Sequence, residues 1–201
     1  MIRVLLAEDQ AMVRGALASL LELEPDIEVI SQVSRGDEVT DAAKQARPDV
    51  ALLDIEMPGA TGLDALEQLN SELPEIRILI LTTFGRPGYL RRAMQNGASG
   101  FLLKDAPAHQ LAAAIRRAVA GERVVDPGLA AAALSQGESP LTVREREVLC
   151  ASREHATIAE IAAALYLSPG TVRNHLSSVM QKLDARNRGE AVKIAEHNGW
   201  L

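Results

Sequence analysis

In the segment DVALLDIEMPG, residues 49–59, a short apolar run ends at the carboxylate of Asp54. Three other apolar runs also end at polar residues, namely Glu8-Asp9, Thr82-Thr83 and Lys104-Asp105. If the four runs are parallel strands, their carboxyl ends share one edge of the sheet, where open α/β sheets bind ligands. Acids clustered at that edge require a cation, so the pattern indicates a divalent-metal site.

Residues 1–120 alternate between strand-like and helix-like segments. Strands are expected at 2–7, 27–33, 49–53, 76–81 and 100–103, and helices near 10–23, 36–46, 61–70, 87–96 and 107–120. The strand segments are short and rich in valine, isoleucine and leucine, as in strands buried on both faces. Strands that alternate with helices of this length predict a parallel α/β sheet.

The alternation ends after residue 120. Residues 121–140 are rich in glycine and proline and predict a linker, within which LAAAAL at 129–134 has the composition of a short helical turn. Residues 141–201 predict only helices, near 143–152, 157–165, 169–183 and 188–198. Thr142 and Glu145 fit a capping box at the start of the first of these helices. The sequence therefore predicts two domains, at 1–120 and 141–201.

Charge is divided unevenly between these domains. The chain of 201 residues has a net charge of −6, with 13 basic and 20 acidic residues in 1–140, and 8 and 7 in 141–201. The net charge of the second domain is weak evidence for nucleic-acid binding, because the domain is near neutral rather than basic. Whether it binds nucleic acid must be judged from where its charges lie. The single cysteine, Cys150, excludes an intramolecular disulfide and a cysteine-ligated zinc site, and is expected to pack as a small hydrophobe.

No targeting or membrane segment is expected. The start, MIRVLLAEDQ, lacks the features of a signal peptide. No window reaches the ~18 uninterrupted apolar residues that a membrane span requires. We therefore expect a soluble cytoplasmic protein with no membrane insertion.

The first domain resembles the receiver domain of two-component response regulators. The site of that family has acids after the first and third strands, a threonine after the fourth and a lysine after the fifth. Here the corresponding residues are Glu8-Asp9, Asp54, Thr82 and Lys104. DIEMPG at 54–59 also matches the family's acceptor loop. The resemblance covers residues 1–120 and implies a flavodoxin- or CheY-like fold with five parallel strands in the order 2-1-3-4-5.

The resemblance implies a role for each acid. Asp54 would be the nucleophile that accepts a phosphoryl group from a phosphohistidine of a sensor histidine kinase. Mg²⁺, or Mn²⁺, would be bound by Asp9, Asp54 and the backbone carbonyl of Glu56, with Glu8 acting through water. The metal would neutralise charge on the transferring group.

Three further residues are implied to respond to phosphorylation. Lys104 would pair with one phosphoryl oxygen, and the Thr82 hydroxyl would move to donate to another. Phe101 resembles the aromatic switch residue of receivers, and would turn inward once Asp54 is modified. A packed aromatic that does not switch is an equally good interpretation of Phe101.

Simpler interpretations exist for these residues one at a time. Glu8 and Asp9 are acids of the kind favoured at helix starts, Lys104 is also a plausible surface lysine, and Thr82 a plausible cap. Their joint order at strand ends favours the phosphoryl site. Two rival functions remain: a receiver that only dimerises or binds a ligand, and a hydrolase with Asp54 as nucleophile and Glu56 as general acid.

The second domain contains a helix-turn-helix pattern. Residues 157–165 predict an apolar-faced helix, 166–169 a turn, and 169–183 a second helix with Ser168 as N-cap and Pro169 at its first position. Apolar residues recur along the second helix at spacings of three and four and predict its buried face: Val172, Leu176, Val179, Met180 and Leu183. Polar residues lie on another side and can reach a major groove: Arg173, Asn174, Ser177 and Gln181.

Residues 140–200 closely resemble the helix-turn-helix of the LuxR/FixJ/NarL group of regulators. The matching residues are PLT at 140–142, RE at 144–145, EVL at 147–149, EIA at 160–162, Leu165, LS at 167–168, TVR at 171–173, His175, KL at 182–183, NR at 187–188 and EAV at 190–192. The resemblance implies base contacts by Arg173, Asn174 and Ser177. It implies phosphate contacts by Ser168, Thr171, Lys182 and Arg188. A helix-turn-helix that serves only protein interaction is the alternative.

Two positions depart from that family's pattern. Residues 153–156 (REHA) occupy a stretch that usually contains a glycine, so a left-handed turn there would need another residue type. Asp184 replaces a second common glycine, which is tolerable at a helix end. These departures bear on loop geometry and leave the expected fold unchanged.

Together the resemblances imply a transcription factor rather than an enzyme. Phosphorylation would make it dimerise and bind a double-stranded operator with paired half-sites, with RNA polymerase as a further partner. Dimer contacts are expected from helices 10–23, 107–120 and 188–198. TTFGRPGY at 82–89 resembles regulators that control membrane-lipid desaturation.

Overall fold

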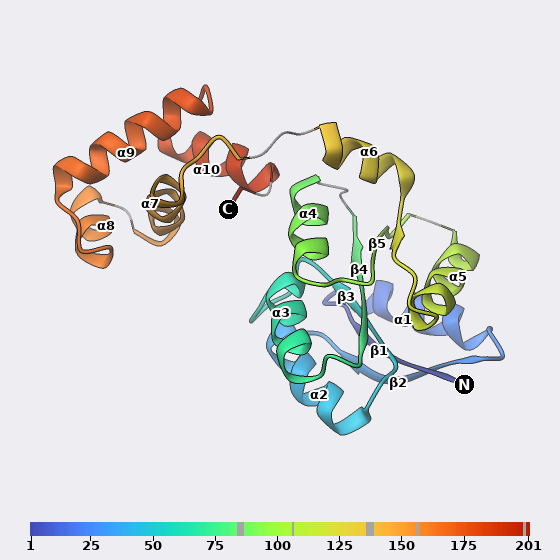
Figure 1. Ribbon diagram of the computed structural model, residues 1–201. Coiled ribbons are helices and arrows are strands. Elements are labelled where there is room, and N and C mark those ends of the chain that lie inside the picture. The colour runs from blue at the N-terminus through green and yellow to red at the C-terminus, as the bar shows by residue number, and fades with distance from the viewer. Residues whose placement is uncertain (84–86, 106, 136–138, 156, 199) are drawn as a thin grey trace. The chain divides into compact units, whose positions relative to one another are not determined.

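The computed structural model describes residues 1–83, 87–105, 107–135, 139–155, 157–198 and 200–201 (Figure 1). Residues 1–85 and 89–131 form one compact unit, and residues 132–201 belong to a second. Among the described residues, no helix is both long and apolar enough to cross a membrane.

The first unit is a parallel sheet with the order β2-β1-β3-β4-β5-β6. Its strands are β1 (Ile2–Ala7), β2 (Ile27–Val33), β3 (Val50–Asp54), β4 (Arg77–Thr82), β5 (Gly100–Leu103) and β6 (Val124–Val125). The helices between them are α1 (Ala11–Glu22), the short 3₁₀ turn η1 (Gly36–Glu38), α2 (Val39–Ala46), α3 (Gly62–Glu72), α4 (Pro87–Gln95) and α5 (Ala108–Val119). The predicted five strands and their order are confirmed.

A sixth strand extends the predicted sheet. Val124 and Val125 pair in parallel with Gly100 and Phe101 of β5, within the segment expected to be a linker. Helix α6 (Pro127–Ser135) follows, so most of 121–140 is regular structure rather than open chain. A strand of two residues is too short to show a sequence period, which is why β6 was not predicted.

Helices cover both faces of this sheet, with α1 and α5 on one and α2, α3 and α4 on the other (Figure 1). Alternate residues of β1 show the pattern: Val4 and Leu6 pack in the cluster that includes Ala18 of α1 and Ile115 of α5. All five residues of β3 are buried, as expected for a central strand with helices on both sides. The layers thus hold the carboxyl ends of the strands at one rigid edge.

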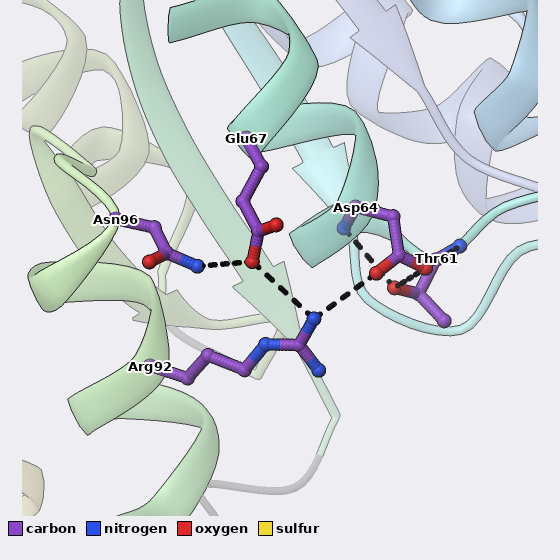
Figure 2. A network of polar contacts seen from close by, with 5 residues as sticks. All are labelled: Thr61, Asp64, Glu67, Arg92 and Asn96. Atoms are coloured by element: carbon purple, nitrogen blue, oxygen red, sulfur yellow. Dashed lines mark hydrogen bonds and ion pairs between the residues drawn. The ribbon is translucent and has the colours of Figure 1, made fainter. Parts of the chain in front are cut away.

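A polar network joins α3 to α4 (Figure 2). One nitrogen of Arg92 on α4 lies 3.0 Å from Asp64 Oδ1 and 3.3 Å from Glu67 Oε1 on α3. Asp64 also forms the capping box of α3 with Thr61, whose backbone N–H and hydroxyl both donate to Asp64 Oδ2. The Asn96 amide donates to Glu67 Oε1. The network therefore ties the N-terminal turns of α3, next to the acceptor loop, to α4.

The second unit contains α7 (Val143–Glu154), α8 (Ile158–Ala164), α9 (Pro169–Lys182) and α10 (Arg188–His197). The predicted capping box of Thr142 and Glu145 is confirmed, and so is Ser168 as the N-cap before Pro169. A second capping box, formed by Thr157 and Glu160, starts α8. Local sequence thus sets where these helices begin.

Two local predictions have different outcomes. Cys150 is exposed, so the expectation that it packs inside is wrong; Val148 and Leu149 occupy the buried face of α7 instead. Asp184 has φ of 49°, so it does take the left-handed conformation expected of a glycine replacement. In the stretch 153–156, where a left-handed turn would need a residue other than glycine, His155 caps the end of α7 with φ of −111°, which is not left-handed. Ala156 lies outside the described residues.

Candidate functional site

The site lies where β1, β3, β4 and β5 end. Asp54 and Thr82 are the last residues of β3 and β4, while Glu8 and Lys104 directly follow β1 and β5. The backbone N–H of Lys104 donates to the Thr82 carbonyl at 2.9 Å, which continues the sheet one residue further. The sheet therefore brings together the four strand-end positions that the sequence singled out.

Helix α3 begins against the acceptor loop. The Gly62 backbone N–H donates to the Ile55 carbonyl at 2.9 Å. A Cβ on Gly62 would lie only 1.9 Å from the Asp54 carbonyl oxygen, so any other residue would push α3 away. Glycine at this position therefore lets the chain turn tightly behind Asp54.

Lys104 joins the two buried acids. Its ammonium nitrogen lies 2.6 Å from Glu8 Oε2 and 2.9 Å from Asp54 Oδ2. Apart from this ion pair, Glu8 Oε2 has no polar partner among the described residues. The other Asp54 oxygen, Oδ1, accepts from the Ile55 backbone N–H at 2.7 Å. Both carboxylates are therefore held in fixed orientations.

Burial sets the electrostatics of this group. Desolvation raises the pKa of the Asp54 carboxyl, and the Lys104 ammonium opposes that rise without cancelling it. The pKa of Glu8 is raised by desolvation first, opposed by Lys104, and raised further by the charge of Asp54. Desolvation lowers the pKa of Lys104, but the two carboxylates outweigh it, so the pKa of Lys104 is raised. Two acids and one ammonium leave an excess negative charge that favours a further cation.

The donor set fits a hard divalent cation. Glu8, Asp9 and Asp54 each offer a carboxylate oxygen, and these three oxygens lie within 4.8 Å of one another. Beside them is a polar hollow of about 110 Å³ lined by Asp9, Gln10, Asp54, Glu56, Thr82 and Thr83. Carboxylate and carbonyl oxygens are the ligands that Mg²⁺ prefers. The residues present are therefore those that a magnesium site requires.

The two expected switch residues are both buried. Thr82 is 5% exposed and lines the hollow. Phe101 is 0% exposed and is the largest fully buried side chain among the described residues. The inward position expected of Phe101 after phosphorylation is thus already occupied in this structure.

In the second unit, α9 separates its buried and polar faces as predicted. Val172, Leu176, Val179 and Leu183 are buried in the core formed with α7, α8 and α10. Arg173, Asn174 and Ser177 are exposed. None of these three makes a side-chain hydrogen bond or ion pair to another residue that the structure describes. They are therefore available to a ligand.

The four residues expected to contact phosphate differ in their availability. Ser168 and Thr171 sit at the start of α9, where their hydroxyl oxygens lie 2.8 Å apart and Ser168 Oγ accepts from the Thr171 N–H. Arg188 donates to the His155 carbonyl at 3.3 Å. The Lys182 ammonium lies 2.7 Å from Glu145 Oε2. Lys182 is thus already paired within the domain.

Glu145 has a structural role that the sequence did not reveal. Glu145 is 4% exposed, and its carboxylate accepts from Lys182 and from the Ser178 hydroxyl, both on α9. Desolvation would raise the pKa of Glu145, but Lys182, Ser178 and the capping bonds with Thr142 outweigh it and lower the pKa to about 2. The capping box was a visible signal; the connection to α9 needed the tertiary structure.

A parallel sheet with an acidic edge, joined in one chain to a helix-turn-helix unit, is the architecture of a two-component transcription regulator. Residues 4–116 match the family described as the response regulator receiver domain. Residues 139–195 match the family described as bacterial regulatory proteins, luxR family. The chain therefore belongs to the response regulators that carry a LuxR-type DNA-binding domain.

Individual relatives agree with this assignment over the whole chain. The uncharacterized transcriptional regulatory protein YvfU of Bacillus subtilis (strain 168) is 49% identical over 201 residues, which is 100% of each chain. The transcriptional regulatory protein DesR of the same organism is 46% identical, also over 100% of each. The crystal structure of ChrA, a response regulator of a heme-sensing two-component system, superposes with a TM-score of 0.59 at 33% identity and covers 100% of this chain and 98% of that one.

These findings bear on two earlier expectations. The relatives are named transcriptional regulators, so the chain is a regulator rather than an enzyme. The similarity to DesR covers residues 82–89, the stretch on which the subgroup resemblance rests. Of that stretch, residues 84–86 lie outside the described part of the chain.

Proposed function

We propose that Asp54 accepts a phosphoryl group from a phosphohistidine of a sensor histidine kinase. A carboxylate oxygen of Asp54 attacks phosphorus, the phosphorus–nitrogen bond breaks, and the imidazole leaves with the electron pair. The observation that carries this proposal is the Asp54–Lys104 pair at 2.9 Å beside a polar hollow at the sheet edge. The Lys104 ammonium would hold an incoming phosphoryl oxygen as a point charge, since its side chain is only 10% exposed and its pKa is raised.

The acids supply the rest of the proposed site. Asp9, Asp54 and the Glu56 carbonyl would hold Mg²⁺ or Mn²⁺, with Glu8 acting through water because its carboxylate faces Lys104 rather than the hollow. When bound, the metal supplies positive charge against the oxygens of the transferring group. The Thr82 hydroxyl would donate to a phosphoryl oxygen, and a movement of Thr82 would be passed to the packing around Phe101.

We further propose that phosphorylation favours a homodimer that binds an operator. Four large apolar residues on or next to α1 and α5 are exposed to solvent. Their exposed fractions are 89% for Met12 and 42% for Leu20 on α1, 79% for Leu23 just after α1, and 40% for Val119 on α5. Association would cover these groups. A dimer doubles the DNA contacts and suits paired half-sites. Because the operator is DNA, we place the protein's action in the cytoplasm, where it would also meet RNA polymerase.

On DNA, the exposed face of α9 would read bases through Arg173, Asn174 and Ser177. Ser168, Thr171, Lys182 and Arg188 would contact phosphates. To contact a phosphate, Lys182 would have to give up its ion pair with Glu145 or share its ammonium group between the two. Its contribution to DNA affinity should therefore be the smallest of the four. Arg173→Ala should relax sequence preference, because base contacts specify and phosphate contacts position.

The test measures acyl-phosphate formation and solution mass together. Wild type, Asp54→Ala and Asp54→Asn are incubated with radiolabelled acetyl phosphate and Mg²⁺, and their masses are measured by light scattering with and without beryllium fluoride. Label and a mass increase in wild type alone support the proposal. Labelling of Asp54→Ala at the wild-type level contradicts the assignment of the acceptor.

The rival functions predict different results. A receiver that never accepts phosphate would take no label in any form. A hydrolase using Glu56 as general acid would turn over a small phosphomonoester rapidly. The exposed position of Glu56 does not favour the hydrolase, because a general acid is held in a defined and usually desolvated place.

A further inference from the structure

The turn between α8 and α9 contains a residue that does not suit its backbone conformation. Helix α8 has Leu165 as its C-cap, and the next residue, Tyr166, has φ of 54°. The Tyr166 N–H donates to the Ala163 carbonyl at 3.3 Å, and the Leu167 N–H donates to the Ala162 carbonyl at 2.8 Å. These bonds form a Schellman motif, in which the left-handed position is usually glycine. A tyrosine there is strained by its Cβ.

Among the described residues, the side chain of Tyr166 makes no contact that would offset that strain. Tyr166 is 96% exposed, the largest exposed fraction among the large apolar and aromatic side chains that the structure describes. Its hydroxyl makes no hydrogen bond to any residue in the described parts of the chain. Its neighbours Leu165 and Leu167 pack against the core, so the turn itself is anchored without it. The tyrosine therefore contributes neither burial nor a polar contact to folding.

The position of Tyr166 relates it to the end of α9 that would enter the major groove. It precedes the N-cap Ser168 by two residues, and Ser168 and Thr171 are the hydroxyl residues expected to contact phosphate. In helix-turn-helix proteins the N-terminal part of the second helix contacts base edges, while neighbouring residues contact the DNA backbone. Tyrosine is among the side chains that donate to phosphate oxygens.

We propose that Tyr166 is a DNA-backbone contact, whose hydroxyl donates a hydrogen bond to a phosphate beside the groove occupied by α9. This inference rests on the proposed DNA binding and adds a contact residue to it. The left-handed turn holds the ring out of the domain, where it can reach DNA. Backbone strain kept at an exposed position is the pattern expected of a functional residue.

The test uses the full chain activated with beryllium fluoride and Mg²⁺. Its probes are a duplex selected by wild type from a randomised pool and a duplex of mixed sequence, with binding followed by fluorescence anisotropy. Tyr166→Phe and Tyr166→Gly should each weaken binding to both duplexes by about threefold to tenfold, as expected for the loss of one hydrogen bond to a charged group. The salt dependence should not change, because the tyrosine is neutral. Tyr166→Gly should melt no lower than wild type, since it removes strain.

Asp184→Gly is the matched control, because Asp184 is a second non-glycine residue with positive φ at a helix end in the same unit. It should bind both duplexes at least as well as wild type, which separates loss of the tyrosine from a gain of glycine. Wild-type binding by Tyr166→Phe overturns the inference and leaves the proposed function standing. If Tyr166→Phe bound DNA like wild type but no longer activated transcription, the partner of Tyr166 would be a protein rather than DNA. Failure of wild type to bind any duplex would overturn both.

Discussion

Lys182 Nζ lies 2.7 Å from Glu145 Oε2, and this ion pair joins the last turn of α9 to the first turn of α7. The helix whose exposed face is expected to read DNA is therefore oriented by a carboxylate inside its own domain. Ser178 donates to the other oxygen, Oε1. Because a buried carboxylate with several donors is costly to unpair, this contact should matter more to stability than the exposed ion pairs of the same unit.

Glu145→Gln should lower the free energy of unfolding of the second unit by about 1–3 kcal/mol, because it removes the charge that Lys182 and Ser178 satisfy. Glutamine can still complete the capping box with Thr142, so helix initiation is largely kept. Urea denaturation followed by a probe in the second unit measures the loss. Glu147→Gln, which removes an exposed partner of Arg144, is the control and should cost less than about 1 kcal/mol. Equal effects of the two substitutions would contradict the special role of Glu145.

The same carboxylate should make the second unit acid-sensitive. Its pKa in the folded state is about 2, below the ordinary value of 4.5. A depressed pKa contributes stability that is complete above the unfolded-state value and is lost as the pH falls toward the folded-state value. The difference in stability between wild type and Glu145→Gln should therefore be constant above about pH 5 and shrink between pH 4.5 and 2. Melting curves of both proteins across that range measure it, and a difference independent of pH would contradict the assignment.

Lys104→Met should destabilise the metal-free receiver by about 2–4 kcal/mol, because Glu8 and Asp54 lose their shared cation in a buried place. Mg²⁺ should restore most of that loss, and should raise the melting temperature of the variant more than that of wild type. Thermal unfolding in EDTA and in Mg²⁺ is the measurement. Lys44→Met, which breaks an exposed pair with Glu72, should respond little to either condition. Equal magnesium responses of Lys104→Met and wild type would argue against a metal at these acids.

Arg92→Ala should release α4 from α3 by removing both contacts that Figure 2 shows for the guanidinium group. All three side chains are partly exposed, so the stability cost should be at most ~1 kcal/mol and smaller in high salt. Hydrogen exchange should speed up in α4 and at the start of α3. Arg117→Ala, which breaks an exposed pair with Glu122 on the other side of the sheet, should leave both segments unchanged. Unchanged exchange in Arg92→Ala would show that packing alone holds α4.

Much of the first unit could be predicted because each signal lies in a few neighbouring residues. Buried parallel strands are short apolar runs, and their carboxyl ends must share one edge, so the positions of Glu8, Asp54, Thr82 and Lys104 at that edge followed from the pattern. The Thr142–Glu145 capping box and the Ser168-Pro169 start of α9 were also local. Strand β6 could not be predicted because a strand of two residues is too short to show a periodic pattern. Cys150 was wrongly expected to be buried because its neighbours Val148 and Leu149 occupy the buried face of α7.

Local patterns in the chain were enough to predict the two-unit architecture, the set of acids at the sheet edge and the helix-turn-helix, because periodicity and capping act within about one turn or one strand. The order of the first five strands followed only from the resemblance to receiver domains. Three facts needed the folded chain: Lys104 bridges Glu8 and Asp54, Lys182 is paired with Glu145, and Phe101 is buried. Such contacts join residues far apart in the chain, and their strength depends on burial, which no local pattern records.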